Sequence, residues 1–210
     1  LKPNTRKRSI KFMFRLLESI RLQNGSFHRL NYHQQRMDRS VKELSGQKNT
    51  ISLFDNLKKY NPPKAGLFKA RIVYSEKLES VEFIPYEIKP VNSLRVVYDQ
   101  EIDYVHKYHD RNNLHALLAQ RQYCDDILIV KNGFVTDSSY SNIIFYDGVN
   151  WITPANPLLK GTMRQFLLDT AEIKAAPVTI QDIPSFKKFR LINSMLAFDG
   201  PEIDVSKIVL

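Results

Sequence analysis

Apolar and polar positions open the chain with a pattern that predicts a β-hairpin. The segment from Met13 to Leu22 has the apolar content of a strand, and a second strand is expected from Ser26 to Leu30. Asn24-Gly25 lies between them, and both residue types tolerate the positive φ of a tight turn. The sequence therefore predicts two paired strands at the start of the chain.

Two helices and a second strand pair are expected next. Residues 31–46 carry many charges and few apolar side chains, which is typical of a surface helix, with Asn31 as its possible cap. Residues 51–60 predict a second helix, which ends at the two prolines after Asn61. Strand-like runs follow at 66–74 and 81–86. This half is expected to be a small α+β domain over an antiparallel sheet.

Short apolar runs separated by turns dominate the second half. Helices are expected over 112–122, from Gly161 to about 173, and briefly near Ser185. Pro85 and Pro90 place a domain boundary between about residues 87 and 100, which gives domains of 13–90 and 91–210, the second a larger α/β domain. The expected strands are 93–98, 126–130, 134–135, 141–146, 151–153, 178–180 and 189–193.

Composition narrows the class of protein. The chain has 210 residues, of which 43% are hydrophobic, enough for one large domain or two small ones. No apolar run approaches the roughly 20 residues of a membrane span, and residues 1–11 lack the apolar stretch of a secretory signal. The single cysteine, Cys124, cannot form an internal disulfide. These features predict a cytoplasmic protein without a membrane partner.

The net charge of +9 is concentrated at one end. Residues 1–11 contain five basic side chains and no acidic one. Such a tail can bind nucleic acid, but a nucleic-acid surface would interleave basic and aromatic residues, and this pattern does not continue beyond residue 11. Residues 1–12 are therefore expected to be a disordered or non-native tail before a start at Met13. The mildly positive body suits a small anionic ligand.

Common catalytic motifs are absent. The sequence has no Gly-x-Gly-x-x-Gly, P-loop, His-Glu-x-x-His or Gly-x-Ser-x-Gly segment, which removes the usual support for nucleotide-binding enzymes, zinc proteases and serine hydrolases. His106 and His109 could share a helix face as metal ligands, but no further cysteine or histidine cluster joins them. No metal is expected.

Four separate features fit one anionic cofactor, pyridoxal phosphate. This cofactor needs a lysine for its Schiff base, an acid at its ring nitrogen, backbone donors at a helix start and a cation for its phosphate. Lys107, Asp137, the helix start at 161–163 and Arg36 could supply them. Each also has a structural explanation: a surface lysine, an Asx turn, a helix cap and a solvated arginine.

Five ordered blocks span nearly the whole chain, from about residue 13 to 204. The first is Leu-Leu-Glu-Ser-Ile-Arg at 16–21 with the Asn-Gly turn and His-Gln-Gln-Arg at 33–36, and the second is His-Lys-Tyr-His-Asp-Arg at 106–111. The others are the segments 125–129, 133–137 and 141–143, then Trp-Ile-Thr-Pro at 151–154 with Leu159 and Gly-Thr-Met-Arg at 161–164, and last Asn-Ser at 193–194. In this order the blocks resemble the class-IV pyridoxal-phosphate enzymes, which include branched-chain aminotransferases, D-amino-acid aminotransferases and aminodeoxychorismate lyases. The resemblance implies the two-domain fold of the D-amino-acid aminotransferase-like enzymes, called fold type IV, with the cofactor held in the larger domain.

The resemblance also implies residue roles. The Schiff-base lysine falls on Lys107, and the acid at the pyridine nitrogen falls on Asp137, where the family usually has Glu. The remaining cofactor-binding positions are Arg36, Asn142, Thr162, Met163 and Ser194. The family normally begins with an Asp-Arg-Gly-Phe-x-x-Gly-Asp-Gly block on the substrate side of the pocket, and residues 1–12 do not contain it.

Within this family the spacing favours a lyase. Arg111 follows Lys107 by four residues, as in the lyases, whereas branched-chain relatives have a tyrosine five residues after the lysine, and Asn112 stands there. The expected reaction converts 4-amino-4-deoxychorismate into 4-aminobenzoate and pyruvate, a step of folate biosynthesis, with Arg71, Arg111 and Tyr140 at the substrate. The alternatives are an aminotransferase of branched-chain or D-amino acids, a member that binds the cofactor without catalysis and a protein that binds through its basic tail. The resemblance further implies a homodimer.

Overall fold

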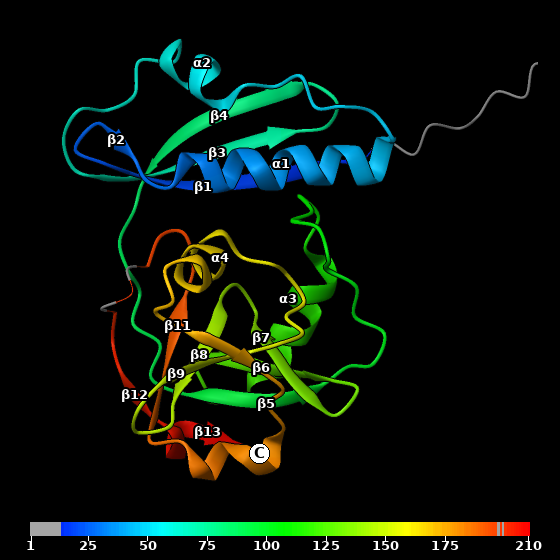
Figure 1. Cartoon of the computed structure of the whole chain (residues 1–210), viewed down its shortest axis with the longest axis vertical. Coiled ribbons are helices and arrows are strands. Elements are labelled where there is room, and N and C mark those ends of the chain that lie inside the picture. Colours follow the sequence, from blue (N-terminus) through cyan, green and yellow to red (C-terminus); the bar gives the residue numbers. More distant parts are fainter. Residues whose placement is uncertain (1–13, 197, 199) are drawn as a thin grey trace, which may run out of the picture.

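The computed structural model describes residues 14–196, 198 and 200–210, which form two sheets, one in each half of the chain (Figure 1). The expected tail of residues 1–12, and Met13, lie outside the described residues. The first sheet holds β1 (Leu16–Gln23), β2 (Ser26–Phe27), β3 (Leu67–Tyr74) and β4 (Leu78–Pro85), in the antiparallel order β2-β1-β3-β4. The Asn24-Gly25 turn that starts it was predicted, and both residues have positive φ. The second strand of this hairpin is shorter than expected.

Helices α1 (Leu30–Ser45) and α2 (Leu53–Lys58) pack on one face of this sheet. Their apolar side chains meet alternate residues of β1 and β3, because successive strand residues point to opposite faces. Asn31 is not the cap of α1. The cap is Arg29, in the left-handed region at φ 52°, and the helix already includes Leu30. The second helix is shorter than expected, and Ser52 caps it by accepting a hydrogen bond from the Asp55 amide.

The second sheet is mixed. Its order is β10-β9-β8-β7-β6-β5-β13, and β11 pairs with both β8 and β12. The pairs β5–β6, β5–β13 and β9–β10 are parallel. Its strands are β5 (Leu94–Tyr98), β6 (Asp126–Lys131), β7 (Phe134–Ser138), β8 (Asn142–Tyr146), β9 (Trp151–Pro154), β10 (Lys174–Ala176), β11 (Lys188–Ile192), β12 (Ile203–Asp204) and β13 (Ile208–Val209).

Several elements of this half differ from the sequence prediction. The helix expected over 112–122 is α3 (Asn112–Leu118) followed by a short 3-10 turn, and α4 (Thr162–Asp169) ends four residues early. No strand covers 178–180: β10 takes the place beside β9, and residues 180–185 form a 3-10 helix capped by Thr179 and Asp182. The short strands β10, β12 and β13 were not predicted.

The segment that carries Lys107 joins the halves. The Leu17 amide donates to the Lys107 carbonyl over 2.9 Å, and the His109 amide donates to the Arg15 carbonyl over 2.9 Å. The chain crosses from β4 to β5 over residues 86–93, where the sequence places the domain boundary; the division into two domains stays a prediction. Within the described residues, no helix has the length and apolarity to span a bilayer.

Candidate active site

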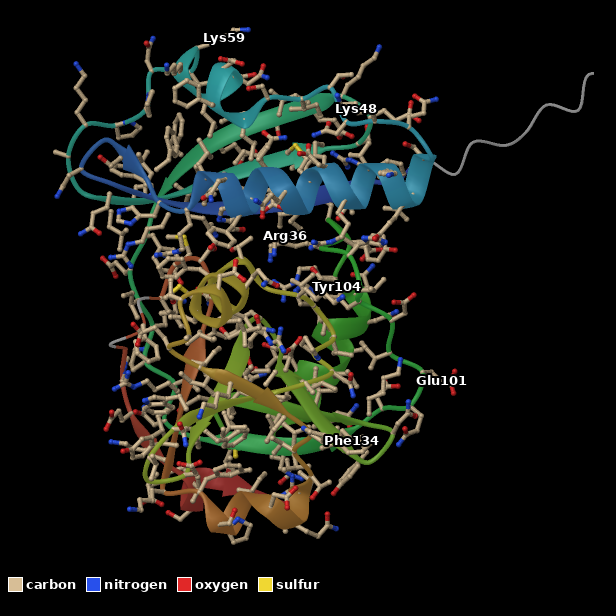
Figure 2. The ribbon with its side chains drawn as sticks, viewed as in Figure 1. Arg36, Lys48, Lys59, Glu101, Tyr104 and Phe134 are labelled. Carbon is tan, nitrogen blue, oxygen red and sulfur yellow. The ribbon has the colours of Figure 1, made fainter. Side chains whose placement is uncertain are left out.

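A pocket between the two halves brings most of the expected site residues together. The empty space within it, counted together with open solvent at its mouth, is about 530 Å³. Figure 2 shows Arg36 on the side of α1 that faces the second half, with Tyr104 across from it. The predicted residues that line the pocket are Arg36, Lys107, Arg111, Asp137, Tyr140, Asn142, Thr162 and Ser194.

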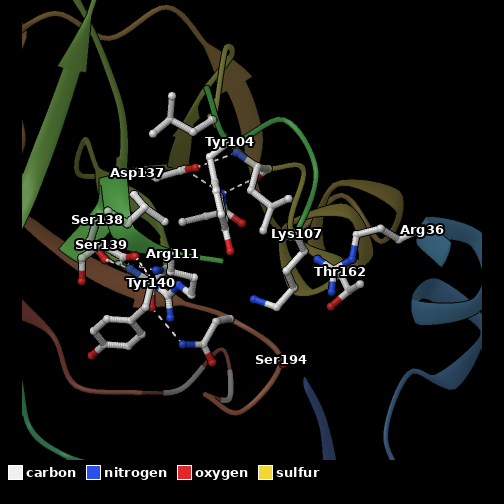
Figure 3. A pocket seen from close by; sticks show the side chains of 16 residues that line it. Arg36, Tyr104, Lys107, Arg111, Asp137, Ser138, Ser139, Tyr140, Thr162 and Ser194 are labelled. Carbon is white, nitrogen blue, oxygen red and sulfur yellow. Dashed lines mark hydrogen bonds between the residues drawn. The ribbon is translucent and has the colours of Figure 1, made fainter. Parts of the chain in front are cut away.

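The Lys107 side chain extends into this pocket between Thr162 and Arg111 (Figure 3). Burial, followed by the positive charges of Arg36 and Arg111, lowers the pKa of the Lys107 amine to about 7. A large fraction of this amine is therefore neutral near pH 7. A neutral amine is the form that acts as a nucleophile or accepts a proton.

Asp137 lies at the corner between β7 and β8, where it pairs in register with Asn142. Its Oδ1 accepts from the Asn142 side-chain amide over 2.7 Å, and its Oδ2 accepts from the Leu159 backbone amide over 2.9 Å. Burial raises the Asp137 pKa to about 6, although both hydrogen bonds act against that shift. The carboxylate is thus fixed in position, and each oxygen keeps a further lone pair for a cationic partner.

Asn142 is packed against the residue that starts α4. A Cβ at Gly161 would lie 2.0 Å from the Asn142 Oδ1, and the Asn142 side-chain amide also donates to the Leu159 carbonyl over 2.9 Å. Gly161 has φ −66°, so its backbone does not require glycine. The close approach of Asn142 requires it.

The first turn of α4 presents free backbone donors. Its first intrahelical bond runs from the Gln165 amide to the Gly161 carbonyl, so the amides of residues 162–164 have no partner within the helix. Such amides, together with the helix dipole, favour a phosphate. Thr162 lines the pocket, whereas the Met163 side chain is buried with Ile144 and Leu167. Only the backbone of Met163 can serve the cofactor.

Arg36 belongs to a buried charge network that the sequence reasoning missed. Its Nε donates to the Glu18 Oε1 over 2.8 Å, its Nη2 donates to the Glu18 Oε2, and the His33 Nδ1 lies 2.6 Å from that same oxygen. Burial raises the Glu18 pKa, but Arg36 and His33 outweigh it and hold the pKa at about 2. Among the described residues Nη1 of Arg36 has no hydrogen-bond partner, so it can still serve a phosphate.

A sequence signal for this network exists. Glu18 occupies the same face of β1 as Leu16 and Ile20, and a carboxylate in a buried apolar face needs a partner. His33 and Arg36 are three residues apart on α1, and helix neighbours at that spacing share a face. The His33 Nε2 also lies 3.5 Å from the Thr162 Oγ1, which links the network to the start of α4.

Ser194 lines the pocket, but its hydroxyl donates to the Ser19 carbonyl over 2.5 Å. While this bond is made, the Ser194 oxygen can only accept further hydrogen bonds. The hydroxyl must rotate before it can donate to a phosphate. Asn193 beside it was not predicted as a site residue; its side-chain amide donates to the Ser141 Oγ over 2.8 Å. This bond ties the 193–196 turn to the loop after Asp137.

Arg111 and Arg71 differ in their hydrogen-bond partners and in their position relative to the pocket. The Arg111 Nη2 donates to the Ser139 carbonyl over 2.6 Å, and its buried Nε has no partner among the described residues. Arg71 does not line the pocket, contrary to expectation. Its guanidinium is engaged by His109, 2.9 Å from Nη2, and by Glu82, 3.5 Å from Nη1. Tyr104, which the sequence reasoning missed, lines the pocket instead.

The two histidines considered as metal ligands contact other groups. The His106 Nδ1 lies 3.3 Å from the Ser40 Oγ, and the His109 Nε2 faces Arg71. In the described part of the chain, no group of three or more His, Cys, Asp or Glu side chains is placed to hold a metal ion.

These residues fit pyridoxal phosphate. The pocket combines a lysine amine with a lowered pKa, a fixed carboxylate, a guanidinium with an unpartnered nitrogen and a helix start whose close packing leaves no room for a Cβ at Gly161. The lysine matches the aldehyde of the cofactor, the carboxylate matches its ring nitrogen, and the guanidinium and the helix start both match its phosphate.

Comparison with known proteins agrees with the fit of the pocket to pyridoxal phosphate. The family model for class IV amino-transferases matches residues 15–198. An uncharacterised protein of Haemophilus influenzae is 36% identical over 185 residues, 87% of this chain and 98% of that protein. A crystal structure of a candidate 4-amino-4-deoxychorismate lyase from Haemophilus somnus 129PT is 34% identical, with a TM-score of 0.82 over 87% of this chain and 96% of that chain.

A more distant structure shares the fold alone. A hypothetical aminotransferase of Mycobacterium tuberculosis in its pyridoxal-phosphate-bound form is 17% identical, with a TM-score of 0.74 over 93% of this chain and 81% of that chain. The match to the class IV family covers more than half of the chain. The chain therefore belongs to the class IV aminotransferase family of pyridoxal-phosphate-dependent enzymes and has its mixed α/β, fold type IV architecture.

Proposed function

We propose that the protein is a lyase that converts 4-amino-4-deoxychorismate into 4-aminobenzoate and pyruvate. The observation that carries the proposal is the shared pocket of Lys107 and Arg111. Asn112, at the position of the branched-chain aminotransferase tyrosine, is exposed and does not line this pocket. The similarity to the Haemophilus somnus candidate lyase, at 34% identity, supports the same reaction.

Lys107 is placed to move the protons of this reaction. When bound, pyridoxal phosphate withdraws electrons from the carbon that carries the substrate amine. The Lys107 amine, with a pKa of about 7, takes the proton from that ring carbon. The neighbouring carbon–oxygen bond then breaks, the ring becomes aromatic and enolpyruvate leaves. Return of the proton to the methylene carbon of enolpyruvate gives pyruvate, so atoms and charges balance.

Other residues of the pocket bind and orient. The amides of Thr162 and Met163 and the free nitrogen of Arg36 would hold the phosphate. Asp137 would bind the ring nitrogen, where its negative charge would favour the protonated ring. Its two protein hydrogen bonds fix the carboxylate, and Arg164, whose charge acts on it, forms no salt bridge with it among the described residues.

We further infer a cytoplasmic homodimer that acts in folate synthesis on a small anionic substrate with an amino group. Family membership supports the dimer and the substrate type. The single cysteine, which cannot form an internal disulfide, supports the location.

The direct test supplies purified holoenzyme with 4-amino-4-deoxychorismate and measures pyruvate and 4-aminobenzoate. We expect the two products in equal amounts and their loss in Lys107→Ala. An aminotransferase would instead convert its cofactor to pyridoxamine phosphate when given a branched-chain or D-amino acid without a keto acid. That result, without pyruvate release from 4-amino-4-deoxychorismate, would contradict the proposal.

A further inference from the structure

One face of the first sheet carries three cations toward the second half of the chain. Arg21, Lys69 and Arg71 occupy alternate positions of β1 and β3, and Arg21 pairs in register with Lys69. Ala70 and Ile72, which alternate with Lys69 and Arg71 along β3, point to the opposite face, into the core with α1. The Arg21 and Arg71 side chains reach across to the second half of the chain.

Two of these cations are already engaged. The Arg21 Nη1 donates to the Met195 carbonyl over 2.6 Å, and its other nitrogens donate to the Gln23 side chain. Arg71 is held by His109 and Glu82. Lys69 differs, since among the described residues its ammonium has no hydrogen bond or ion pair. It lies 5.9 Å from the centre of the Tyr86 ring.

Lys69 does not line the pocket itself, but its neighbours on this face reach the segments that do. Arg21, its partner in register, contacts Met195 beside Ser194, and Arg71, two residues further along β3, contacts His109, two residues after Lys107. The charge of Lys69 also contributes to the lowered pKa of the Lys107 amine. Arg111 acts on the same amine and lines the pocket itself. Arg111 donates to a neutral carbonyl and has a buried nitrogen without a partner. Lys69 and Arg111 are thus two cations near one amine, and neither has an acidic partner in the described residues.

The acids of the site do not neutralise this pair. Glu18 is bound to Arg36 and His33, and Asp137 is held by Asn142 and the Leu159 amide. An incoming ligand must therefore bring the negative charge. A ligand with one carboxylate would leave one of the two cations unmatched, whereas two carboxylates would match both.

We propose that Lys69 and Arg111 each bind one carboxylate of the substrate, so that the site selects a dicarboxylate with its amine directed to Lys107. This inference rests on the proposed lyase function, whose substrate carries two carboxylates. It assigns to Lys69 the substrate role first expected of Arg71, two residues further along the same strand face.

The test compares two aromatic ligands that differ by one carboxylate, 3-(carboxymethoxy)benzoate and 3-methoxybenzoate. Calorimetric titration of the holoenzyme measures the dissociation constant of each. We expect the dicarboxylate to bind at least about tenfold more tightly, the size expected of one charge-assisted hydrogen bond. Lys69→Met should remove most of this preference and leave the affinity for the monocarboxylate unchanged, while Lys69→Arg should retain it.

Lys77→Met is the matched control, because it removes the same charge from an exposed position at the far end of the β3–β4 hairpin. It should keep the preference. A holoenzyme that binds both ligands equally, or a preference that survives Lys69→Met, overturns the inference. Pyruvate release from 4-amino-4-deoxychorismate is a separate measurement. The lyase proposal can therefore stand if the carboxylate assignment fails, and the carboxylate assignment can stand if no pyruvate is released.

Discussion

Buried ionisable side chains set the chemistry of this protein at the scale of single residues. Glu18 and Asp137 are buried and Lys107 is half-buried, and their surroundings shift the pKa of each from its ordinary value. Burial favours the uncharged forms of Lys107 and Asp137, whereas Arg36 and His33 keep Glu18 ionised. An amine with a pKa near 7 can both accept and return a proton near neutral pH, as general acid–base catalysis requires.

The lowered pKa of Lys107 predicts an effect on stability. Between about pH 7 and 10.5 the unfolded apoprotein binds a proton at this lysine that the folded apoprotein does not, so folding is less favourable at the lower pH. Lys107→Met lacks this cost. We expect the variant to exceed the wild type in free energy of unfolding at pH 7, and the difference to shrink toward pH 10. Urea denaturation at both pH values measures it; a gap that does not change with pH would contradict the assignment.

Replacing Asp137 by glutamate, the residue that the family normally has there, should destabilise this protein. Both oxygens of Asp137 are fixed at 2.7 and 2.9 Å, and an added methylene would displace the carboxylate from both donors. We expect Asp137→Glu to cost about 1–3 kcal/mol in unfolding free energy, as overpacked sites do. It should also weaken cofactor binding, measured by absorbance titration. Equal or tighter binding would show that the pocket has room for the longer acid.

Individual site residues were predictable where a motif marked them. Lys107, Arg36, Asp137 and Thr162 were named from the sequence, and the structure brings them to one pocket. Arg71 was named with them but does not line the pocket, and the sequence does not reveal that His109 and Glu82 contact its guanidinium. Glu18 lay in a recognised block, but the block does not say which cation it binds.

At the scale of elements, α4 and the β7–β8 corner are fitted to each other through Gly161 and Asn142. A methyl group at Gly161 would collide with the Asn142 side chain, which positions Asp137. We expect Gly161→Ala to lower the unfolding free energy by about 1–3 kcal/mol and to weaken cofactor binding. Thermal denaturation with and without pyridoxal phosphate measures both effects.

A double-mutant cycle identifies the cause. In the Asn142→Ala background the collision is gone, so the same change at Gly161 should cost much less. Additive losses would mean that Gly161 is needed for another reason.

Turn chemistry made some elements predictable, and long-range pairing made others unpredictable. Asn24-Gly25 and Asn132-Gly133 have the positive φ values that their side chains suggest, and both turns connect the expected strands. The strand expected at 178–180 failed because a capping box starts a 3-10 helix there. The two-residue strands β12 and β13 exist only through partners distant in sequence, so local patterns do not reveal them.

Over the whole molecule, the Glu18 network connects β1, α1 and the start of α4 across the two halves. Because the Glu18 pKa is about 2 in the fold and 4.5 is its ordinary value, its contribution to stability is present above about pH 4.5 and is lost as pH falls toward 2. Glu18→Gln should cost about 3–5 kcal/mol near pH 7, since it leaves Arg36 buried without a counter-charge. Chemical denaturation from pH 7 to 3 should show this deficit narrowing; a constant deficit would contradict the ion pair.

The pocket itself is a property of the complete fold. Its lining comes from α1, the segment before α3, the β7–β8 corner, the start of α4 and the 193–194 turn, so no single block contains it. The order of blocks indicated which residues would share a function. Their common position depends on how the two sheets meet beside Lys107, and that contact is made by backbone hydrogen bonds that no sequence pattern specifies.

The central claim is that Lys107 holds the cofactor. Borohydride reduction of the holoprotein attaches pyridoxyl phosphate permanently to the lysine that holds it, and peptide mass spectrometry then locates the added mass. We predict the modification on the peptide that contains Lys107, and none in Lys107→Ala. Recovery of the modified residue at any other lysine would contradict the account.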